Sequence, residues 1–262
     1  MNTPTKSTAF LLAFLVAGAA WSAIIGAHEL LGHGGHCALD PNCTWVYADA
    51  MYFDGDYADG VVNNWQVAAG SVLAVLLGVI AALVLQFRRP RSFSLYVFLW
   101  ALAAAGLIQS GAYVAFGWLI HPGMDWAQLV AKAGGGPVPK TAVTVGGVLL
   151  ILGGVWTARR LMPIVEVRGG TLTGLPLVLA TYLGFSVTAL AASWFVPADD
   201  RLFMLYGGLG SGTLFMFWFL FAALPGRGVA PPVKIGNAWA TALVPALVMF
   251  AYVFVLGRGI DF

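Results

Sequence analysis

The chain has 262 residues, of which 60% are hydrophobic and only 9% are charged, and its formal net charge is +2. Soluble domains carry about 25% charged residues, so this composition excludes a water-soluble globule, which would lack the polar side chains to cover its surface. The hydrophobic excess predicts an all-α bundle of membrane-spanning helices, because lipid requires an apolar helix exterior. Without a basic cluster, nucleic acid is not expected as a partner, whereas membrane lipid is.

Seven apolar stretches are long enough to cross a bilayer, which takes roughly 20 residues each. They cover residues 8–28, 64–87, 94–120, 141–161, 172–195, 202–224 and 237–257. Removal of the first stretch as a signal peptide is an alternative, because Lys6 precedes an apolar run that ends in small residues, and it would leave six spans. We expect residues 1–262 to form a single integral membrane domain.

The basic residues predict an orientation. With a cytoplasmic N-terminus, nine of the 13 Lys and Arg residues fall on the cytoplasmic side, namely Lys6, Arg88, Arg89, Arg91, Arg159, Arg160, Arg168, Arg227 and Lys234. The positive-inside rule therefore predicts that the N-terminus lies inside and the C-terminus outside. The expected location is a membrane of the bacterial inner (plasma) membrane type, with residues 37–63 as an extracytoplasmic polar loop.

This loop contains both cysteines, Cys37 and Cys43. A disulfide is expected if the loop faces an oxidising compartment, and free thiols or a soft metal site are the alternatives. Its five aspartates alternate with aromatic residues, a pattern typical of a loop anchored at the membrane interface. The sequence DGDYAD at 54–59 also admits a calcium site, since Ca²⁺ prefers carboxylate and carbonyl oxygens.

The strongest chemical signal is the sequence GAHELLGHGGH at the end of the first span. Three of the four histidines, His28, His33 and His36, lie within nine residues, beside one of only two glutamates. Ionisable residues in a membrane helix are costly and usually have a partner or a function. Imidazoles with a carboxylate favour Zn²⁺, with copper or iron as alternatives. The simpler interpretation is an interfacial helix end, with polar side chains and two glycines that terminate the helix.

The spacing of these residues limits which of them can share a helix face and bind one metal ion. In the HExxH motif, histidines at i and i+4 share one helix face, whereas His28 and His33 are five positions apart. A regular α-helix would leave them about 140° apart, so convergence requires a one-residue π-bulge, which Gly32 would ease. Without the bulge, Glu29, His33 and His36 would share a face, and Glu29 would be a ligand instead of a base.

A second polar cluster, HPGMDW, follows the third span and is expected on the same outer face. Asp125 is the natural third ligand, with His121 as a spare imidazole, although an aspartate here can also cap the next helix. Asn63, Asn64 and Gln66 open the second span. They can hydrogen-bond a substrate carbonyl or a ligand, or they can cap this helix.

The sequence HELLGHGGH, followed by NNWQVAAGSVLAVLLG and later by GMDW, resembles the intramembrane zinc metalloproteases of the site-2 protease type. The resemblance covers roughly residues 20–130. It implies that His28, His33 and Asp125 bind zinc and that Glu29 activates water. The chain departs from the family in having HExxxH instead of HExxH, and it lacks the usual Asn-Pro-rich, Asp-Gly context around the aspartate. The family commonly has its zinc site toward the cytoplasm, whereas the charge rule predicts the opposite side here.

Three functions follow. The first is a membrane-embedded zinc-dependent hydrolase with Glu29 as general base, acting on a membrane protein or peptide, or on a lipid amide. The second is a metal-binding or metal-handling membrane protein, in which Glu29 would be a ligand. The third is a non-catalytic subunit of a membrane complex, which should tolerate the substitution Glu29→Gln.

Overall fold

The computed structural model of this chain describes residues 3–58, 60, 62–196, 205, 207–224 and 232–262. The described residues contain six helices that are long and apolar enough to cross a membrane, so the predicted all-α membrane bundle is confirmed. They are Lys6–Leu39, Asn64–Phe87, Phe93–Ile120, Pro137–Arg160, Leu175–Phe195 and Ala238–Arg258. The predicted span 202–224 is in its described part a shorter apolar helix, Gly207–Ala223, and its first residues lie outside the described part of the chain.

Two of the long helices change their winding along their length. The first is made of α1 (Lys6–Gly26), the π-helical segment η1 (Ala27–His33) and α2 (Gly34–Leu39). The third is made of α4 (Phe93–Ala104), the π-helical segment η2 (Ala105–Gln109) and α5 (Ser110–Ile120). The shorter helix likewise contains the π-helical segment η3 (Gly210–Leu214), followed by the 3₁₀ segment η4 (Phe215–Ala223).

The remaining helices are wound regularly for most of their length. They are α3 (Asn64–Phe87), the short α6 (Asp125–Lys132), α7 (Pro137–Arg160), α8 (Leu175–Phe195) and α10 (Ala238–Phe254), after which η5 (Leu256–Arg258) forms a 3₁₀ turn. Asn63 caps α3 by accepting a hydrogen bond of 2.8 Å from the backbone N–H of Gln66.

The first helix occupies the centre of the bundle. α1 packs against α4, α8 and α10, and its Trp21 and Ile24 are fully buried. Small residues permit the close approach of backbones in such bundles: a methyl group added at Gly184 of α8 would lie 2.4 Å from the carbonyl oxygen of Phe14. Leucine, valine and aromatic side chains project from the outer helices, as a lipid-facing surface requires.

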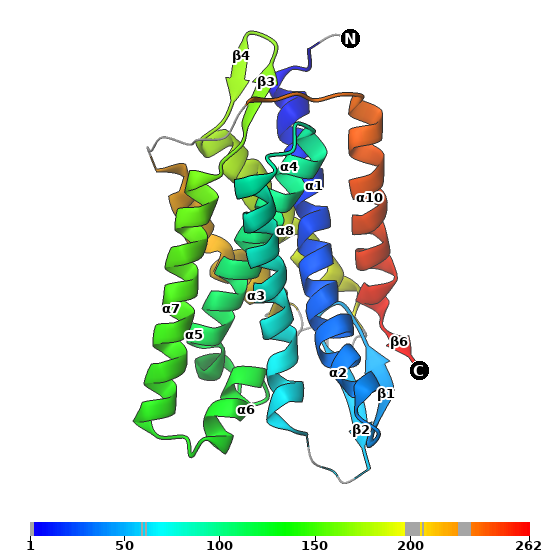
Figure 1. The fold of residues 1–262 in the computed structure, drawn as a ribbon. Coiled ribbons are helices and arrows are strands. Elements are labelled where there is room, and N and C mark those ends of the chain that lie inside the picture. The colour runs from blue at the N-terminus through cyan, green and yellow to red at the C-terminus, as the bar shows by residue number, and fades with distance from the viewer. Residues whose placement is uncertain (1–2, 59, 61, 197–204, 206, 225–231) are drawn as a thin grey trace.

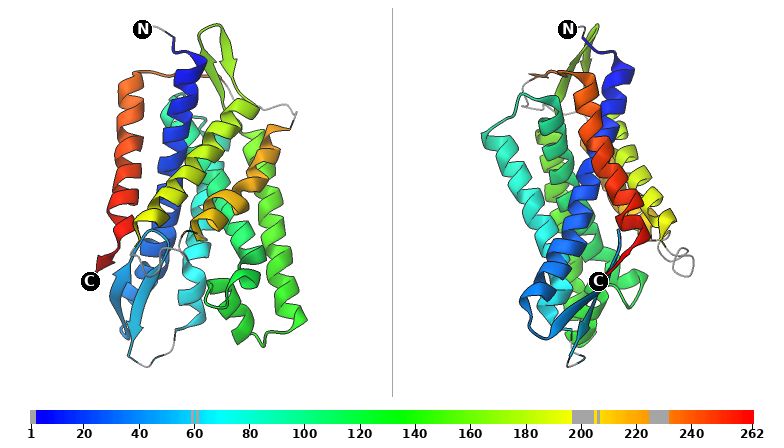
Figure 2. Two further views of the ribbon diagram at one scale, coloured as in Figure 1. Left: turned by 180° about the vertical axis from the view of Figure 1, so that it is seen from behind. Right: turned by 90° about the vertical axis from the view of Figure 1, so that its right-hand side faces the viewer.

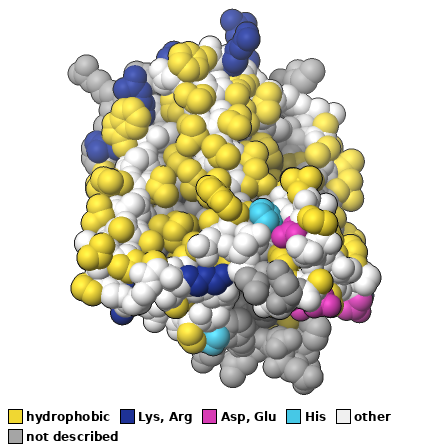
Figure 3. All heavy atoms as spheres, turned by 60° about the horizontal axis from the view of Figure 1, so that its bottom comes forward, with side chains coloured by type: hydrophobic (Ala, Val, Ile, Leu, Met, Phe, Trp, Pro, Cys, Tyr) yellow, Lys and Arg dark blue, Asp and Glu magenta, His cyan; other side chains and the backbone are white. Residues whose placement is uncertain are grey.

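The helices run along one long axis, with the two chain termini at opposite ends (Figure 1). The turn between α3 and α4 lies at the N-terminal end, and α6 lies at the other end (Figures 1 and 2). On the face drawn in Figure 3, hydrophobic side chains cover the upper and middle parts, and the visible acidic side chains lie on the right, one of them beside a histidine near the middle and the others lower down. The direction in which the bundle is inserted stays a prediction.

The predicted polar loop contains a β-hairpin, which was not predicted from the sequence. Strands β1 (Cys43–Ala48) and β2 (Phe53–Tyr57) pair antiparallel, and β6 (Ile260–Asp261) at the C-terminus adds to β1. The order β2-β1-β6 makes β2 an edge strand. At the opposite end, β3 (Ile164–Val167) lies between β4 (Gly170–Leu172) and β5 (Pro232–Val233).

The two cysteines form a disulfide, so the first of the three alternatives for this pair is correct. Cys37 lies on α2 and Cys43 begins β1, and the bond therefore ties the hairpin to the end of the first helix. Strand β2 covers it closely: a methyl group on Gly55 would lie 2.8 Å from the sulfur of Cys43. The hairpin is consequently fixed beside the polar residues of η1.

Candidate metal centre

The π-helical segment η1 brings His28 and His33 onto one face. Their Nε2 atoms are 3.3 Å apart, and their rings meet edge to face with centroids 5.0 Å apart. A π-bulge adds one residue to a helical turn, which offsets the rotation that five α-helical positions would produce. The bulge that the spacing required is therefore present. Gly32 contacts α3 within it, since a methyl group on Gly32 would lie 2.5 Å from the Cα atom of Gly70.

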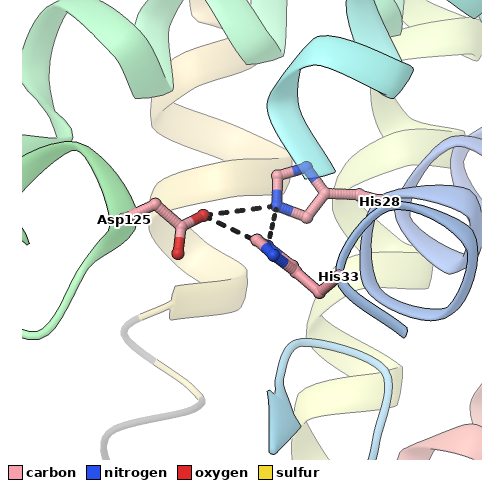
Figure 4. A group of neighbouring side chains, drawn as sticks. All are labelled: His28, His33 and Asp125. Carbon is pink, nitrogen blue, oxygen red and sulfur yellow. Dashed lines mark hydrogen bonds and ion pairs between the residues drawn. The ribbon is translucent and has the colours of Figure 1, made fainter. Parts of the chain in front are cut away.

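Asp125 completes the group from the opposite side (Figure 4). Asp125 is the first residue of α6. Its Oδ2 lies 3.3 Å from His33 Nε2 and 3.6 Å from His28 Nε2. Two hydrogen bonds fix this end of α6: Trp126 Nε1 donates to Ser71 Oγ of α3 at 3.0 Å, and the Asp125 N–H donates to the Tyr113 hydroxyl oxygen at 3.3 Å.

The three converging atoms fit a tetrahedral metal ion. Zinc binds imidazole nitrogen and carboxylate oxygen at about 2.0–2.2 Å, and two such ligands at a tetrahedral angle lie about 3.4 Å apart. The observed separations of 3.3, 3.3 and 3.6 Å agree with this value. His28, His33 and Asp125 form the one group in the described part of the chain in which three or more such side chains can hold a metal. The calcium alternative at DGDYAD stays a prediction, since Asp54 and Asp56 lie on β2 but Asp59 is outside the described residues.

Hydrogen bonding prepares His33 for a ligand role. Its Nδ1–H donates to the backbone carbonyl oxygen of Gln66 at 2.7 Å, so Nε2 is the ring nitrogen that faces the centre. A metal-binding histidine commonly donates its other ring nitrogen to a carbonyl or carboxylate in this way. Burial alone would raise the pKa of Asp125, but its contacts with His28 and His33 outweigh burial and hold this pKa well below the usual range. A low pKa favours the ionised carboxylate, which is the form that binds a metal ion.

Glu29 lies beside this group but outside it. Its Oε1 is 3.9 Å from His28 Nε2, and its side chain is buried. His36, also a predicted ligand, belongs to α2 and is not among the three converging residues. The predicted ligands His28, His33 and Asp125 thus come together, Glu29 remains adjacent, and His36 does not join them.

Among the other predicted polar residues, the capping alternative is confirmed for Asn63. Asn63 caps α3, and Asn64 is the first residue of this helix. Gln66 contributes its backbone carbonyl to His33, and not its side chain. His121 follows α5, where its Nδ1 accepts a hydrogen bond of 3.1 Å from the Gly123 N–H.

Two cavities meet at Glu29. The first has a volume of about 480 Å³ and a mainly apolar lining that includes residues of η2 and η3. The second, of about 390 Å³, is more polar and borders strand β2, His33 and Asp125. The residues that line both are Glu29, Met51, Tyr113, His121 and Met124. A substrate at the centre would therefore lie between an apolar and a polar compartment.

Sequence reasoning missed two residues that shape the centre. Gly70 of α3 lies against both imidazoles: a methyl group there would be 2.5 Å from His28 Nε2 and 2.6 Å from His33 Nε2. Tyr113 is edge-on to His28, with ring centroids 6.0 Å apart. The small-residue run AAGS was visible in the sequence, but its position opposite the histidines depends on long-range packing.

Comparisons with known proteins give no family assignment. Neither a family model, nor a curated protein, nor a solved structure matches this chain.

Proposed function

We propose that this protein is a membrane-embedded zinc-dependent hydrolase, and specifically a metallopeptidase of the site-2 protease type. One observation carries the proposal: the three ligand atoms are as far apart as the ligands of one tetrahedral zinc ion, while a buried glutamate remains outside the ligand group. Catalytic zinc sites usually have three protein ligands and keep one position open for water or substrate. A purely structural zinc site would instead have four protein ligands.

The residues of the centre have three roles in this reaction. Zn²⁺, when bound by His28, His33 and Asp125, supplies a Lewis acid that polarises the scissile carbonyl and lowers the pKa of water toward about 7. Glu29 accepts the proton of the attacking water and transfers it to the amine that leaves when the C–N bond breaks. The Gln66 carbonyl holds the His33 ring in the required orientation.

The hairpin favours a peptide as substrate. Strand β2 is an edge strand, and it lines the polar cavity that contains His33 and Asp125. An edge strand offers unpaired backbone groups, with which an extended peptide can pair. A peptide held there would present successive carbonyl groups to the metal centre.

A metal-handling protein is the second candidate. His121, Met51 and Met124 line both cavities next to the centre, and thioether and imidazole ligands suit copper as well as zinc. In that function Glu29 would act as a further ligand. Its carboxylate is 3.9 Å from His28 Nε2 and outside the converging group, which favours the hydrolase.

The chain's only other glutamate provides a matched control. Zinc-loaded protein in detergent micelles is incubated with unfolded, fluorescein-labelled casein as a general peptide-bond probe. Glu29→Gln should lower the cleavage rate by about 10²–10⁴-fold, the usual contribution of general acid–base catalysis, with unchanged zinc content. Glu166→Gln, which alters an exposed ion pair with Lys234, should have the wild-type rate. Undiminished cleavage by Glu29→Gln, or no zinc-dependent cleavage by the wild type, would contradict the proposal.

A further inference from the structure

The apolar cavity is bordered by all three π-helical segments of the described chain. η1 contributes His28 and Glu29, η2 contributes Gln109, and η3 contributes Ser211 and two further residues. π-Bulges are rare and occur mostly at functional sites, because they redirect side chains at a cost in regular helix bonding. Only the bulge in η1 is explained by the metal ligands. The other two direct side chains into the cavity beside them.

Besides His28 and Glu29, two buried polar side chains interrupt the apolar lining. Gln109 and Ser211 are only 4% and 8% exposed. Gln109 Oε1 accepts a hydrogen bond of 3.4 Å from Ser110, whereas Ser211 Oγ has no hydrogen-bond partner among the described residues. A buried hydroxyl without a partner costs about 1–3 kcal/mol. A ligand with one polar atom at its far end would remove this cost.

The rest of the cavity suits a large apolar group. Its wall includes Ile25, Leu214 and Phe215, and its volume of about 480 Å³ falls within the roughly 300–1,000 Å³ usual for ligand sites. Because Glu29 and His28 form one side of the cavity, a group bound in it is attached close to the bond that the metal centre would cleave.

We propose that this cavity is the specificity pocket of the enzyme and binds a tyrosine or tryptophan side chain next to the cleaved peptide bond, with Ser211 as hydrogen-bond partner of its polar tip. These two side chains combine a large apolar ring with one polar atom that needs a partner when buried. They are also enriched at the interfacial ends of membrane helices, and η1 lies toward the end of the bundle that contains the β1–β2 hairpin (Figure 1). This inference rests on the proposed peptidase function and adds its substrate preference.

Peptidyl hydroxamates test the pocket by binding alone, because the hydroxamate binds zinc without turnover. Four probes are identical except for the side chain next to the hydroxamate, which is that of alanine, leucine, phenylalanine or tyrosine. Isothermal titration with zinc-loaded protein should show the tyrosine probe binding at least tenfold more tightly than the alanine probe and several-fold more tightly than the phenylalanine probe. A site that bonds a hydroxyl disfavours the analogue that lacks it.

Two pocket variants and one control test which residues form the pocket. Ser211→Ala should lower the affinity for the tyrosine probe to that for the phenylalanine probe. It should leave the affinity for the alanine probe unchanged. Ser22→Ala is the matched control, because Ser22 is also buried but donates to the Gly18 carbonyl within α1; it should change no affinity. Leu214→Trp, which adds bulk at the cavity wall, should reduce the preference for large side chains and preserve binding of the alanine probe.

The outcomes separate this inference from the proposed function. Equal binding of all four probes would overturn the pocket and leave the peptidase standing. Tighter binding of dodecanoyl hydroxamate than of every peptidyl probe would also overturn it, in favour of a lipid acyl chain. If no hydroxamate binds zinc-loaded protein, both the inference and the proposed function fail.

Discussion

The Nε2 atoms of His28 and His33 lie 3.3 Å apart although the residues are five positions apart on one helix. The π-helical segment η1 makes this possible, because its extra residue returns His33 to the face that His28 occupies. The flanking segments α1 and α2 then continue as one helix. The bulge thus brings both histidines of HExxxH onto one helix face, as the shorter spacing of HExxH does in a regular α-helix.

Deletion of one residue tests this account of the bulge. Leu31 lies between the two histidines and is 66% exposed, so its removal should let η1 become regular α-helix with the histidines at i and i+4. We expect this variant to fold and to keep its metal, as measured by size-exclusion chromatography and elemental mass spectrometry.

Deletion of Ile80 is the control. Ile80 is also exposed, at 54%, but it lies within the regular helix α3, where a deletion rotates all following residues by about 100°. This variant should misfold. Loss of the metal after deletion of Leu31, in a protein that still folds, would show that the π-bulge is not what aligns the histidines.

Gly70 provides a second test of the centre. A methyl group there would lie 2.5 Å from His28 Nε2 and 2.6 Å from His33 Nε2, closer than atoms can approach. Gly70→Ala should therefore displace the imidazoles and weaken metal affinity by at least tenfold. Gly153→Ala, in α7, places its methyl group in open space and should bind metal normally. Competition titration with a zinc-binding dye measures both, and equal affinities would contradict the geometry.

The spans could be predicted from hydrophobicity alone, because each lipid-facing helix must be apolar over most of its length. The predicted range 64–87 agrees with α3, whereas the first helix runs eleven residues beyond the predicted end at 28, to Leu39. The polar sequence HELLGHGGH caused this error. Its histidines suggested a helix end, but two of them, His28 and His33, lie beside Asp125 and the helix continues without a break.

The site could be predicted only in part. The ligand types and Asp125 follow from residue chemistry and the resemblance, but convergence of His28 with His33 depended on a bulge that the spacing alone could not guarantee. The decisive contacts are long-range: Gly32 against Gly70, and Gln66 with His33. The β1–β2 hairpin escaped prediction because its strands are short and β6 reaches it from the C-terminus.

The burial of Asp49 leads us to expect that stability depends on pH. Asp49 precedes the turn of the hairpin and is 1% exposed, and burial raises its pKa to about 6 in spite of hydrogen bonds from the Met51 N–H and the Tyr47 hydroxyl. Its pKa in the unfolded chain is about 4. The folded state therefore binds the proton more tightly, and the stability from this group is complete below about pH 4 and lost as the pH rises through about 6.

Asp49→Asn imitates the protonated form. We expect it to raise the stability at pH 7.5 by at most about 3 kcal/mol, because a pKa difference of one unit corresponds to about 1.4 kcal/mol. The difference from wild type should disappear near pH 4. Thermal unfolding in detergent between pH 4 and 8 measures this. A variant less stable than wild type at pH 7.5 would contradict the assigned direction.

The central claim is that His28, His33 and Asp125 hold one metal ion, and elemental mass spectrometry of the detergent-purified protein tests it most directly. The wild type, prepared without chelator, should contain about one zinc per chain. His33→Ala and Asp125→Ala should lose it, whereas His36→Ala should keep it, since His36 lies outside the converging group. A wild type that is free of metal and takes up no added zinc would contradict the account, as would loss of zinc in His36→Ala but not in His33→Ala.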